Sequence, residues 1–299
     1  MQQTKVNDLI FKELVKRGYS LKGRTRVWNI ADSKLWYLTP EQAQGYLDLS
    51  DMKNYPSSFD SKKMTFNKET ELIEKNVDKI IKIIGQGSLN LVDLGCGDGR
   101  KAITFLKKIK EKEKVRYCPI DISGFYVNKA IENVTQVDVD EVIKFQWNIS
   151  DFDNLENVTP MLNKEGFQKN FFLLLGNTAG NFEFHELLYE IRGAMKKGDY
   201  LLIGNGLDNG FVVRDVVDHL RQSKPLYKFF VQIPLGLGLK ESEVEFGIEF
   251  NNSRVEYIFS IKEDVTISFQ DKQINLYKGD QMIVGYTYHY TAEDLLRYL

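Results

Sequence analysis

The chain has 299 residues, of which 42% are hydrophobic and 27% are charged, and its formal net charge is -2. This composition is typical of a folded globular protein, and the balance of charges excludes a global electrostatic attraction to nucleic acid. The sequence shows neither a membrane-spanning apolar run nor a signal-peptide pattern, so we expect a cytoplasmic protein.

The two cysteines, Cys96 and Cys118, lie in or beside predicted buried strands, so they indicate neither a disulfide framework nor a zinc site. The three histidines stand singly, and no group of His, Cys, Asp or Glu has the spacing of metal ligands. We therefore expect no metal.

Residues 1–88 are predicted to form a helical, aromatic-rich N-terminal cap. Apolar spacing predicts one helix over 6–17 and another over 67–84. A helix between them is predicted to begin at Pro40, with Thr39 as its N-cap. Packing is the favoured explanation for any single aromatic residue here, but as a group they are candidates for an active-site lid: Tyr19, Trp28, Trp36, Tyr37, Tyr46, Tyr55 and Phe59.

Residues 89–205 show the alternation of strands and helices that predicts an α/β core. The apolar run Leu89–Leu94 predicts a buried parallel strand, and an amphipathic helix follows a turn with glycines at three alternate positions. In open α/β sheets, such a turn is where nucleotide-like ligands bind, because glycine lets the backbone approach the ligand closely.

Two ligands compete for this turn, whose residues are Gly95, Gly97 and Gly99. Dinucleotide folds use G-x-G-x-x-G, whereas here the spacing is G-x-G-x-G with Asp93 before it and Asp98 within it. Two carboxylates would repel a pyrophosphate but attract a sulfonium and an ammonium. The stretch resembles the first motif of class I S-adenosylmethionine (SAM) methyltransferases, and this resemblance implies SAM as cofactor, with these five residues binding it.

Two further strand ends carry predicted SAM contacts. The stretch 115–123 contains a second strand that ends in Asp121, whose carboxylate is placed to accept hydrogen bonds from the ribose hydroxyls. A third strand over 142–147 is followed by Asp151 and Phe152, which we assign to the adenine amino group and ring. Without the glycine motif, Asp151 would be only a turn residue.

A fourth strand over 171–175 leads into the loop Gly176–Phe182, and a helix over 183–195 and a strand over 200–204 complete the pattern. The predicted fold is therefore a class I SAM-methyltransferase (Rossmann-like) α/β sheet with helices on both faces. Gly176 and Asn177 are expected to contact the cofactor because ligands bind at the carboxyl ends of such strands.

The stretch LLLGNTAGNFE resembles the FLGSTIGNF signature of the histidine-specific Nα-methyltransferases of ergothioneine biosynthesis. NYPSS at Asn54–Ser58 is similar to the YYPTR stretch of that family, and the similarity extends over most of the chain. The resemblance implies a SAM-dependent methyltransferase in which Asn181 and Tyr55 act at the acceptor.

Residues 206–299 alternate in hydropathy, which predicts antiparallel strands in a β-rich, substrate-covering lobe whose last strands return to the core. In the resembled family, a Glu-x-Ser in the last strands holds the substrate amino acid, but Gly285 and Thr287 stand at those positions. The Arg-Thr-Glu that follows YYPT is also absent. We assign Tyr286 and Thr287 to the substrate, but not histidine as the substrate, because losing a buried carboxylate changes the ligand.

We therefore expect a SAM-dependent N-methyltransferase that acts on a small amino-acid-like or amine substrate. An amine must be neutral to attack, so an enzyme of this kind positions the nucleophile and helps to remove a proton, for which His289 or a tyrosine is available. Two alternatives stay open: a methyltransferase of a protein or RNA target, and a catalytically inactive SAM-binding regulatory protein.

Overall fold

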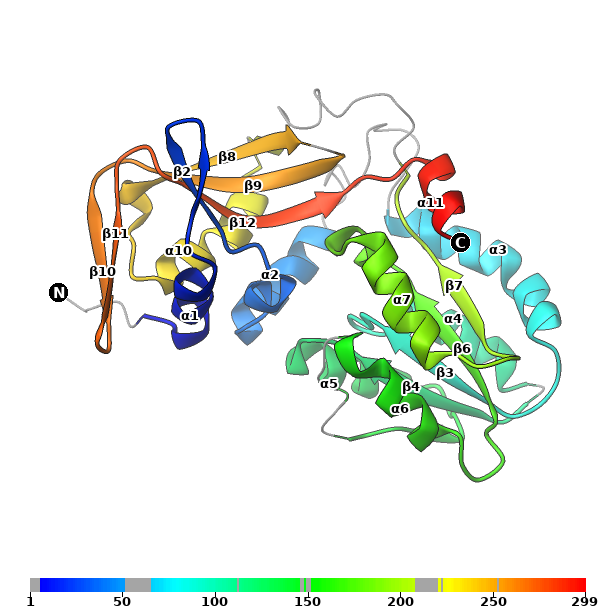
Figure 1. Ribbon diagram of the computed structural model, residues 1–299. Coiled ribbons are helices and arrows are strands. Elements are labelled where there is room, and N and C mark those ends of the chain that lie inside the picture. The colour runs from blue at the N-terminus through cyan, green and yellow to red at the C-terminus, as the bar shows by residue number, and fades with distance from the viewer. Residues whose placement is uncertain are drawn as a thin grey trace. The chain divides into compact units, whose positions relative to one another are not determined.

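The computed structural model describes residues 6–51, 66–111, 113–145, 148, 152–207, 220–221, 223–251 and 253–299 (Figure 1). The chain divides into two compact units. Met1–Phe59 and Gly210–His289 form one, here called the mixed-sheet unit, and Asp60–Asn209 and Tyr290–Leu299 form the other, the parallel-sheet unit. Among the described residues, no helix combines the length and apolar character needed to cross a membrane.

The parallel-sheet unit alternates strands and helices along the chain, as the sequence pattern predicts. Its strands are β3 (Leu89–Leu94), β4 (Val115–Ile120), β5 (Glu141–Val142), β6 (Lys169–Leu174) and β7 (Tyr200–Ile203). Its helices are α3 (Phe66–Ile84), α4 (Arg100–Ile109), α5 (Gly124–Val134), α6 (Leu155–Leu162), α7 (Phe184–Ala194) and α11 (Ala292–Tyr298), with short 3-10 turns η3 (Phe152–Asn154) and η4 (Thr178–Asn181).

The five strands are all parallel and lie in the order β5-β4-β3-β6-β7. One face carries α3, α4 and α5, whose Val77, Phe105 and Val127 pack on Leu91 and its neighbours. The other face carries α6, since Asn90 of β3 donates a hydrogen bond to the Leu162 carbonyl at the end of that helix. The order reverses at β3, so a crevice for ligands is expected between the carboxyl ends of β3 and β6.

The mixed-sheet unit holds a five-stranded sheet in the order β1-β2-β12-β9-β8 and a separate β10–β11 hairpin. The strands are β1 (Ser20–Lys22), β2 (Thr25–Asn29), β8 (Val244–Asn251), β9 (Arg254–Ile261), β10 (Val265–Phe269), β11 (Lys272–Leu276) and β12 (Gln281–Tyr288). Around them lie α1 (Asp8–Arg17), η1 (Ser33–Trp36), α2 (Pro40–Asp51), α9 (Lys224–Phe230), α10 (Gln232–Gly236) and η5 (Glu241–Glu243), and apolar residues of α1, η1, α9 and α10 form its core with β9 and β12.

These units differ from the domain boundaries predicted at residues 88/89 and 205/206. Helix α3, assigned to the N-terminal cap, packs on the parallel sheet through Ile73 and Val77. The cap is also not purely helical, because β2 pairs in parallel with β12 near the opposite end of the chain. Return to the core is made by Tyr290 and α11 rather than by β12, since Tyr290 bridges Leu207 and its hydroxyl donates to the Phe182 carbonyl at 3.1 Å.

The third strand of the parallel sheet, β5, spans only Glu141–Val142, so residues 143–145 of the predicted 142–147 are not in a strand, and residues 146–147 lie outside the described residues. The reason lies at Asn148, a buried residue. Its side-chain amide accepts the Phe145 N–H and donates to the Pro119 carbonyl at 2.6 Å. These bonds join Asn148 to Phe145 and to the end of β4, close to where the sequence pattern alone predicts a continuing strand.

Candidate functional site

The glycine loop joins β3 to α4 with its three glycines in the left-handed region, at φ 67° for Gly95, 52° for Gly97 and 75° for Gly99. Two of them also permit close approach. A Cβ on Gly95 would lie 2.7 Å from Thr178 Oγ1, and one on Gly99 would lie 3.2 Å from Ala130. The loop is therefore pressed against the turn after β6 on one side and against α5 on the other, which explains why glycine is needed there.

Asp121 lies at the end of β4, beside this loop, and is buried. Its Oδ2 accepts the N–H of Gly97 at 3.1 Å, and its Oδ1 accepts the N–H of Ser123 at 3.0 Å. Burial raises the pKa of Asp121 to about 6, although the backbone hydrogen bonds oppose that rise. The carboxylate is held rigidly and retains lone pairs, as a group that binds ribose hydroxyls must.

The two loop carboxylates are engaged differently from the sequence-based expectation. Asp93 is buried and accepts a hydrogen bond from the Tyr117 hydroxyl at 2.8 Å, and desolvation raises its pKa to about 7. The Asp98 carboxylate pairs with the Arg100 side chain and accepts the Arg100 N–H at 3.2 Å. In this structure, both carboxylates have protein partners, so neither is simply an unpaired anion that faces a cationic ligand.

Phe152, predicted to stack on adenine, is buried and packs against Phe182 with a ring-centroid distance of 5.4 Å. It therefore lies beside the loop that follows β6. Its predicted neighbour Asp151 lies outside the described residues, as does Tyr55.

The loop Gly176–Phe182 is held from several directions. Asn177 has a left-handed backbone with φ 65°, and its Oδ1 accepts the Gly206 N–H at 3.1 Å, which ties the loop to the end of β7. Asn181 ends η4 and is half-buried. Next to Gly206, Asn205 donates to the Gly206 carbonyl, and its buried Oδ1 lacks a partner among the described residues.

Sequence reasoning missed Glu69, Lys101 and Asn205. Glu69, in the first turn of α3, pairs with Lys101 of α4 and accepts the Gly176 N–H. Lys101 had a local signal, since it is a cation two residues past the last glycine of the loop. Glu69 had none, because only the packing of α3 on the sheet brings it to the end of β6.

Tyr286 and Thr287, both assigned to the substrate, are adjacent residues of β12 and therefore point to opposite faces of the mixed sheet. Thr287 shares a face with Tyr257 and is hydrogen-bonded to its side chain. Tyr286 lies on the other face beneath Arg254, whose guanidinium is 5.0 Å from the ring centroid. One ligand on one face of this sheet therefore meets only one of the two.

Gly285, where the resembled family has a glutamate, has no room for a side chain. A Cβ there would lie 2.6 Å from Phe230 Cε1 and 2.7 Å from Trp36 Cζ2. Trp36 donates its indole N–H to the Val284 carbonyl at 2.8 Å, which fixes its ring over the strand. Aromatic rings thus occupy the place that a longer side chain would take.

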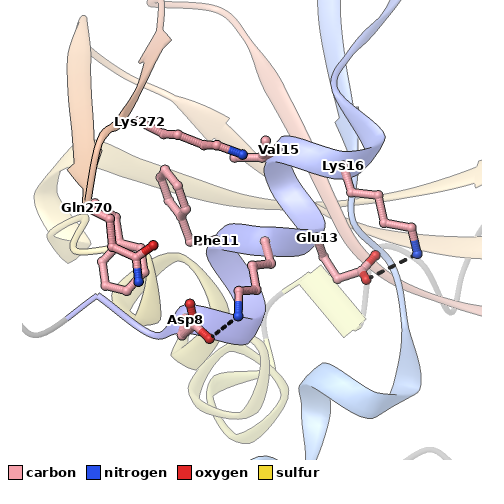
Figure 2. Close-up of a pocket in the computed structure, with 9 residues that line it drawn as sticks. Asp8, Phe11, Glu13, Val15, Lys16, Gln270 and Lys272 are labelled. Atoms are coloured by element: carbon pink, nitrogen blue, oxygen red, sulfur yellow. Dashed lines mark hydrogen bonds and ion pairs between the residues drawn. The ribbon is translucent and has the colours of Figure 1, made fainter.

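A pocket of about 340 Å³ lies elsewhere in the mixed-sheet unit, beside α1 and the β10–β11 turn (Figure 2). Phe11 and Phe269 line its apolar part with ring centroids 5.3 Å apart, and Lys12 at its rim pairs with Asp8 at 2.6 Å. The described residues that we predict to bind SAM or the acceptor lie outside this pocket, so it is not part of the candidate site.

A family model described as "Histidine-specific methyltransferase, SAM-dependent" matches residues 64–214, about half of the chain. A search of curated proteins gave no match.

Several solved structures are similar to the chain at low identity. An O-methyltransferase family protein from Burkholderia thailandensis is 10% identical over 95% of this chain and 83% of that chain, with a TM-score of 0.36. A sugar N-methyltransferase from Streptoalloteichus is 12% identical over 77% of this chain and 76% of that chain, with a TM-score of 0.33. A SAM-dependent methyltransferase from Thiobacillus denitrificans, solved with S-adenosyl-L-homocysteine, is 11% identical over 63% of this chain and 69% of that chain, with a TM-score of 0.35.

Proposed function

The chain belongs to the family of SAM-dependent histidine-specific methyltransferases, and from that premise we propose that it methylates a nitrogen atom of a small amino-acid-like or amine substrate. SAM is its methyl donor, and the parallel sheet in the order β5-β4-β3-β6-β7 is that of a class I SAM methyltransferase.

The donor end of the site fits SAM in its chemistry. Asp121 offers a buried carboxylate to the ribose hydroxyls, with Gly95 and Gly97 leaving bare backbone beside it. We assign Phe152 and Asp151 to the adenine, and Lys101 to the methionyl carboxylate, because an ammonium is the natural partner of that anion. When bound, SAM supplies an electrophilic methyl group on a sulfonium, and the protein's part is to bind and orient.

The observation that carries an amine acceptor is the amide oxygen of Asn205, which has no hydrogen-bond partner in the described part of the chain. A buried carbonyl oxygen without a donor is costly, and an N–H of an incoming amine would satisfy it. An amide oxygen can hold an amine in its neutral form, whereas a carboxylate would favour the charged ammonium. Asn181, in the loop that Asn177 ties to the same strand end, is assigned to hold the second N–H.

The acceptor is proposed to differ from histidine. In the resembled family, a glutamate on the last strands holds the substrate amino acid, and here the aligned Gly285 is closed off by Trp36 and Phe230. A substrate whose charged group needs that glutamate would lose its partner, which costs several kcal/mol for a buried charge. We therefore propose an amine that does not need this carboxylate, rather than histidine.

The function is tested by incubating the enzyme with methyl-tritiated SAM and panels of amino acids, amines and cell extract. We expect label in a small-molecule fraction, and mass spectrometry should locate it on nitrogen. Label found only in protein or RNA would reject the proposal in favour of a macromolecular acceptor, and no transfer despite SAM binding would favour an inactive binding protein.

Two variants then test the residue roles. Asn205→Ala and Asn181→Ala should each lower kcat/KM by about 10- to 100-fold, the equivalent of one or two hydrogen bonds, while S-adenosylhomocysteine affinity stays within about twofold. Asn163→Ala is the matched control, because Asn163 also has a buried, unpartnered amide oxygen but lies at the end of α6. Equal losses in the control and in Asn205→Ala would reject the assigned role of Asn205.

A further inference from the structure

Glu69 is held by two donors that together make a carboxylate-binding position. The Gly176 N–H donates to both of its oxygens, at 3.0 Å to Oε1 and 3.2 Å to Oε2, and the Lys101 ammonium contacts Oε2. The Lys101 side chain is 11% exposed and the Glu69 side chain is 23% exposed. A partly buried ammonium and a backbone N–H that converge on one carboxylate are strong, charge-assisted donors.

The surrounding backbone is shaped to leave room for this carboxylate. A Cβ on Gly176 would lie 2.8 Å from Lys101 Nζ, and a Cβ on Gly204 would overlap Glu69 Oε1. Gly176 also has φ 76°, a conformation that glycine adopts readily. Bare backbone at the ends of β6 and β7 thus allows a carboxylate to reach Lys101, whichever molecule that carboxylate belongs to.

The position is also close to the donor site. Lys101 is the second residue of α4, which begins directly after the glycine loop, and Gly176 lies two residues past the end of β6. The same crevice, at the carboxyl ends of β3 and β6, is where an α/β sheet of this topology binds its ligand. SAM carries one carboxylate, on its methionyl group, and this group needs donors of the kind that Glu69 now occupies.

We infer that Glu69 is an internal competitor of SAM, a side chain that fills the carboxylate position of Gly176 and Lys101 and is displaced when the methionyl carboxylate enters. This rests on the proposed assignment of Lys101 to that carboxylate. The single Gly176 N–H and the side of the Lys101 ammonium that faces it accommodate one carboxylate, and a second carboxylate at the same position would be repelled by the first, so the two compete for it. Because Glu69 lies in the first turn of α3, its release couples donor binding to the start of that helix.

The consequence is a donor affinity lower than the site could provide. A binding position that is competent for only part of the time lowers the apparent affinity by that fraction. The penalty applies only to ligands that carry the carboxylate. It should be absent for 5′-methylthioadenosine, which has the nucleoside and thioether but lacks the amino-acid part.

The experiment compares S-adenosylhomocysteine and 5′-methylthioadenosine by isothermal titration with the full-length wild type and Glu69→Gln. We expect Glu69→Gln to bind S-adenosylhomocysteine about tenfold more tightly, a typical coupling magnitude, and 5′-methylthioadenosine within about twofold of wild type. Glu71→Gln is the matched control, since Glu71 is an exposed glutamate two residues along the same helix. Melting curves of each variant establish that it is folded, and Glu69→Ala serves as a second variant.

Lys101→Met and its combination with Glu69→Gln complete a double-mutant cycle on this position. Lys101→Met alone should reduce S-adenosylhomocysteine affinity toward that of 5′-methylthioadenosine, and adding Glu69→Gln to it should bring no further gain, because nothing remains to compete for. Unchanged or weaker S-adenosylhomocysteine binding by Glu69→Gln would overturn the inference, as would equal tightening of both ligands. Strong S-adenosylhomocysteine binding that Lys101→Met leaves intact would instead reject the assignment of Lys101, and the inference with it.

Discussion

The proposed donor end of the parallel sheet and the last strand of the mixed sheet are lined by different kinds of chemical group. Around Gly97 and Asp121, the groups are backbone N–H donors and carboxylates joined by hydrogen bonds. Around Gly285, the groups are aromatic rings. Phe230 is stacked on Tyr257 with ring centroids 4.2 Å apart, and it makes an edge contact with Trp36 with centroids 5.5 Å apart. The first arrangement suits a hydroxylated, charged ligand, and the second suits apolar surface.

The two regions also differ in how the chain assembles them. The proposed donor site uses successive strand ends of one α/β repeat, so its residues are close in sequence and can be recognised from their spacing. Gly285 meets Trp36 and Phe230, which come from η1 and α9, and no short motif links them. Substitutions in the first region should therefore change ligand binding, and those in the second should change packing.

The largest effect is expected from Asp121→Asn, which keeps the shape of the side chain but removes its charge. The Gly97 and Ser123 N–H groups and, in the proposed assignment, the ribose hydroxyls then lose a charged acceptor, and hydrogen bonds to charged groups contribute about 1.5–3 kcal/mol each. We expect S-adenosylhomocysteine affinity, measured by isothermal titration, to fall by roughly 10- to 100-fold.

Asp271→Asn, in the exposed turn between β10 and β11, is the control and should bind as the wild type does. The unaltered enzyme should also bind less tightly as the pH falls through about 6, the pKa of Asp121, because protonation removes the same charge. Wild-type affinity in Asp121→Asn would mean that the donor site lies away from this strand end.

A smaller effect, on stability rather than on binding, is expected from Gly285→Ala. Its Cβ would come within 2.6–2.7 Å of Phe230 and Trp36, and overpacking of this kind costs about 1–3 kcal/mol. Urea unfolding should report that loss, with S-adenosylhomocysteine affinity retained in the folded enzyme.

Gly247→Ala is the matched control for Gly285→Ala, since its Cβ in β8 of the same sheet would meet only the Ile258 carbonyl, at 4.0 Å. Gly285→Ala combined with Trp36→Phe should recover part of the loss, because the smaller ring makes room. A fully stable Gly285→Ala variant would show that rings do not close this position.

This contrast explains what could be predicted from the sequence. The strand Leu89–Leu94, the glycine loop and Asp121 follow from local pattern, and the structure contains each of them. The partners of Asp93 and Asp98 could not be predicted, because Tyr117 and Arg100 carry no signal that they would take those carboxylates.

The remaining misses arise where distant segments meet. Glu69 reaches Gly176 only through helix packing, β2 joins β12 across nearly the whole chain, and the Asn148 side chain shortens the third strand. None of these contacts is marked in the sequence by a hydropathy period or by a short motif. The domain boundaries differ for the same reason, since the helix α3 is local in sequence but its burial is decided by the sheet.

The smallest expected effect on ligand binding, and the one that separates stability from function in the donor region, is that of Asp93→Asn. Burial, and more weakly Asp121 and Asp98, raise the pKa of Asp93 from 3.8 to about 7, against the opposing influence of the Tyr117 hydroxyl and Lys101. The folded state therefore favours the protonated carboxyl, and the stability that this contributes is full below about pH 4 and is lost as the pH rises through 7.

Asparagine cannot ionise, yet its amide oxygen can still accept a hydrogen bond from the Tyr117 hydroxyl. The unfolding free energy of Asp93→Asn should thus match that of wild type near pH 4 and exceed it increasingly as the pH rises to 7, by on the order of a few kcal/mol, because each unit of pKa shift corresponds to about 1.4 kcal/mol. Tyr117→Phe removes a hydrogen bond that lowers the pKa of Asp93, so the melting temperature of this variant should fall relative to wild type as the pH rises. A difference between Asp93→Asn and wild type that does not change with pH would mean that Asp93 is ionised throughout.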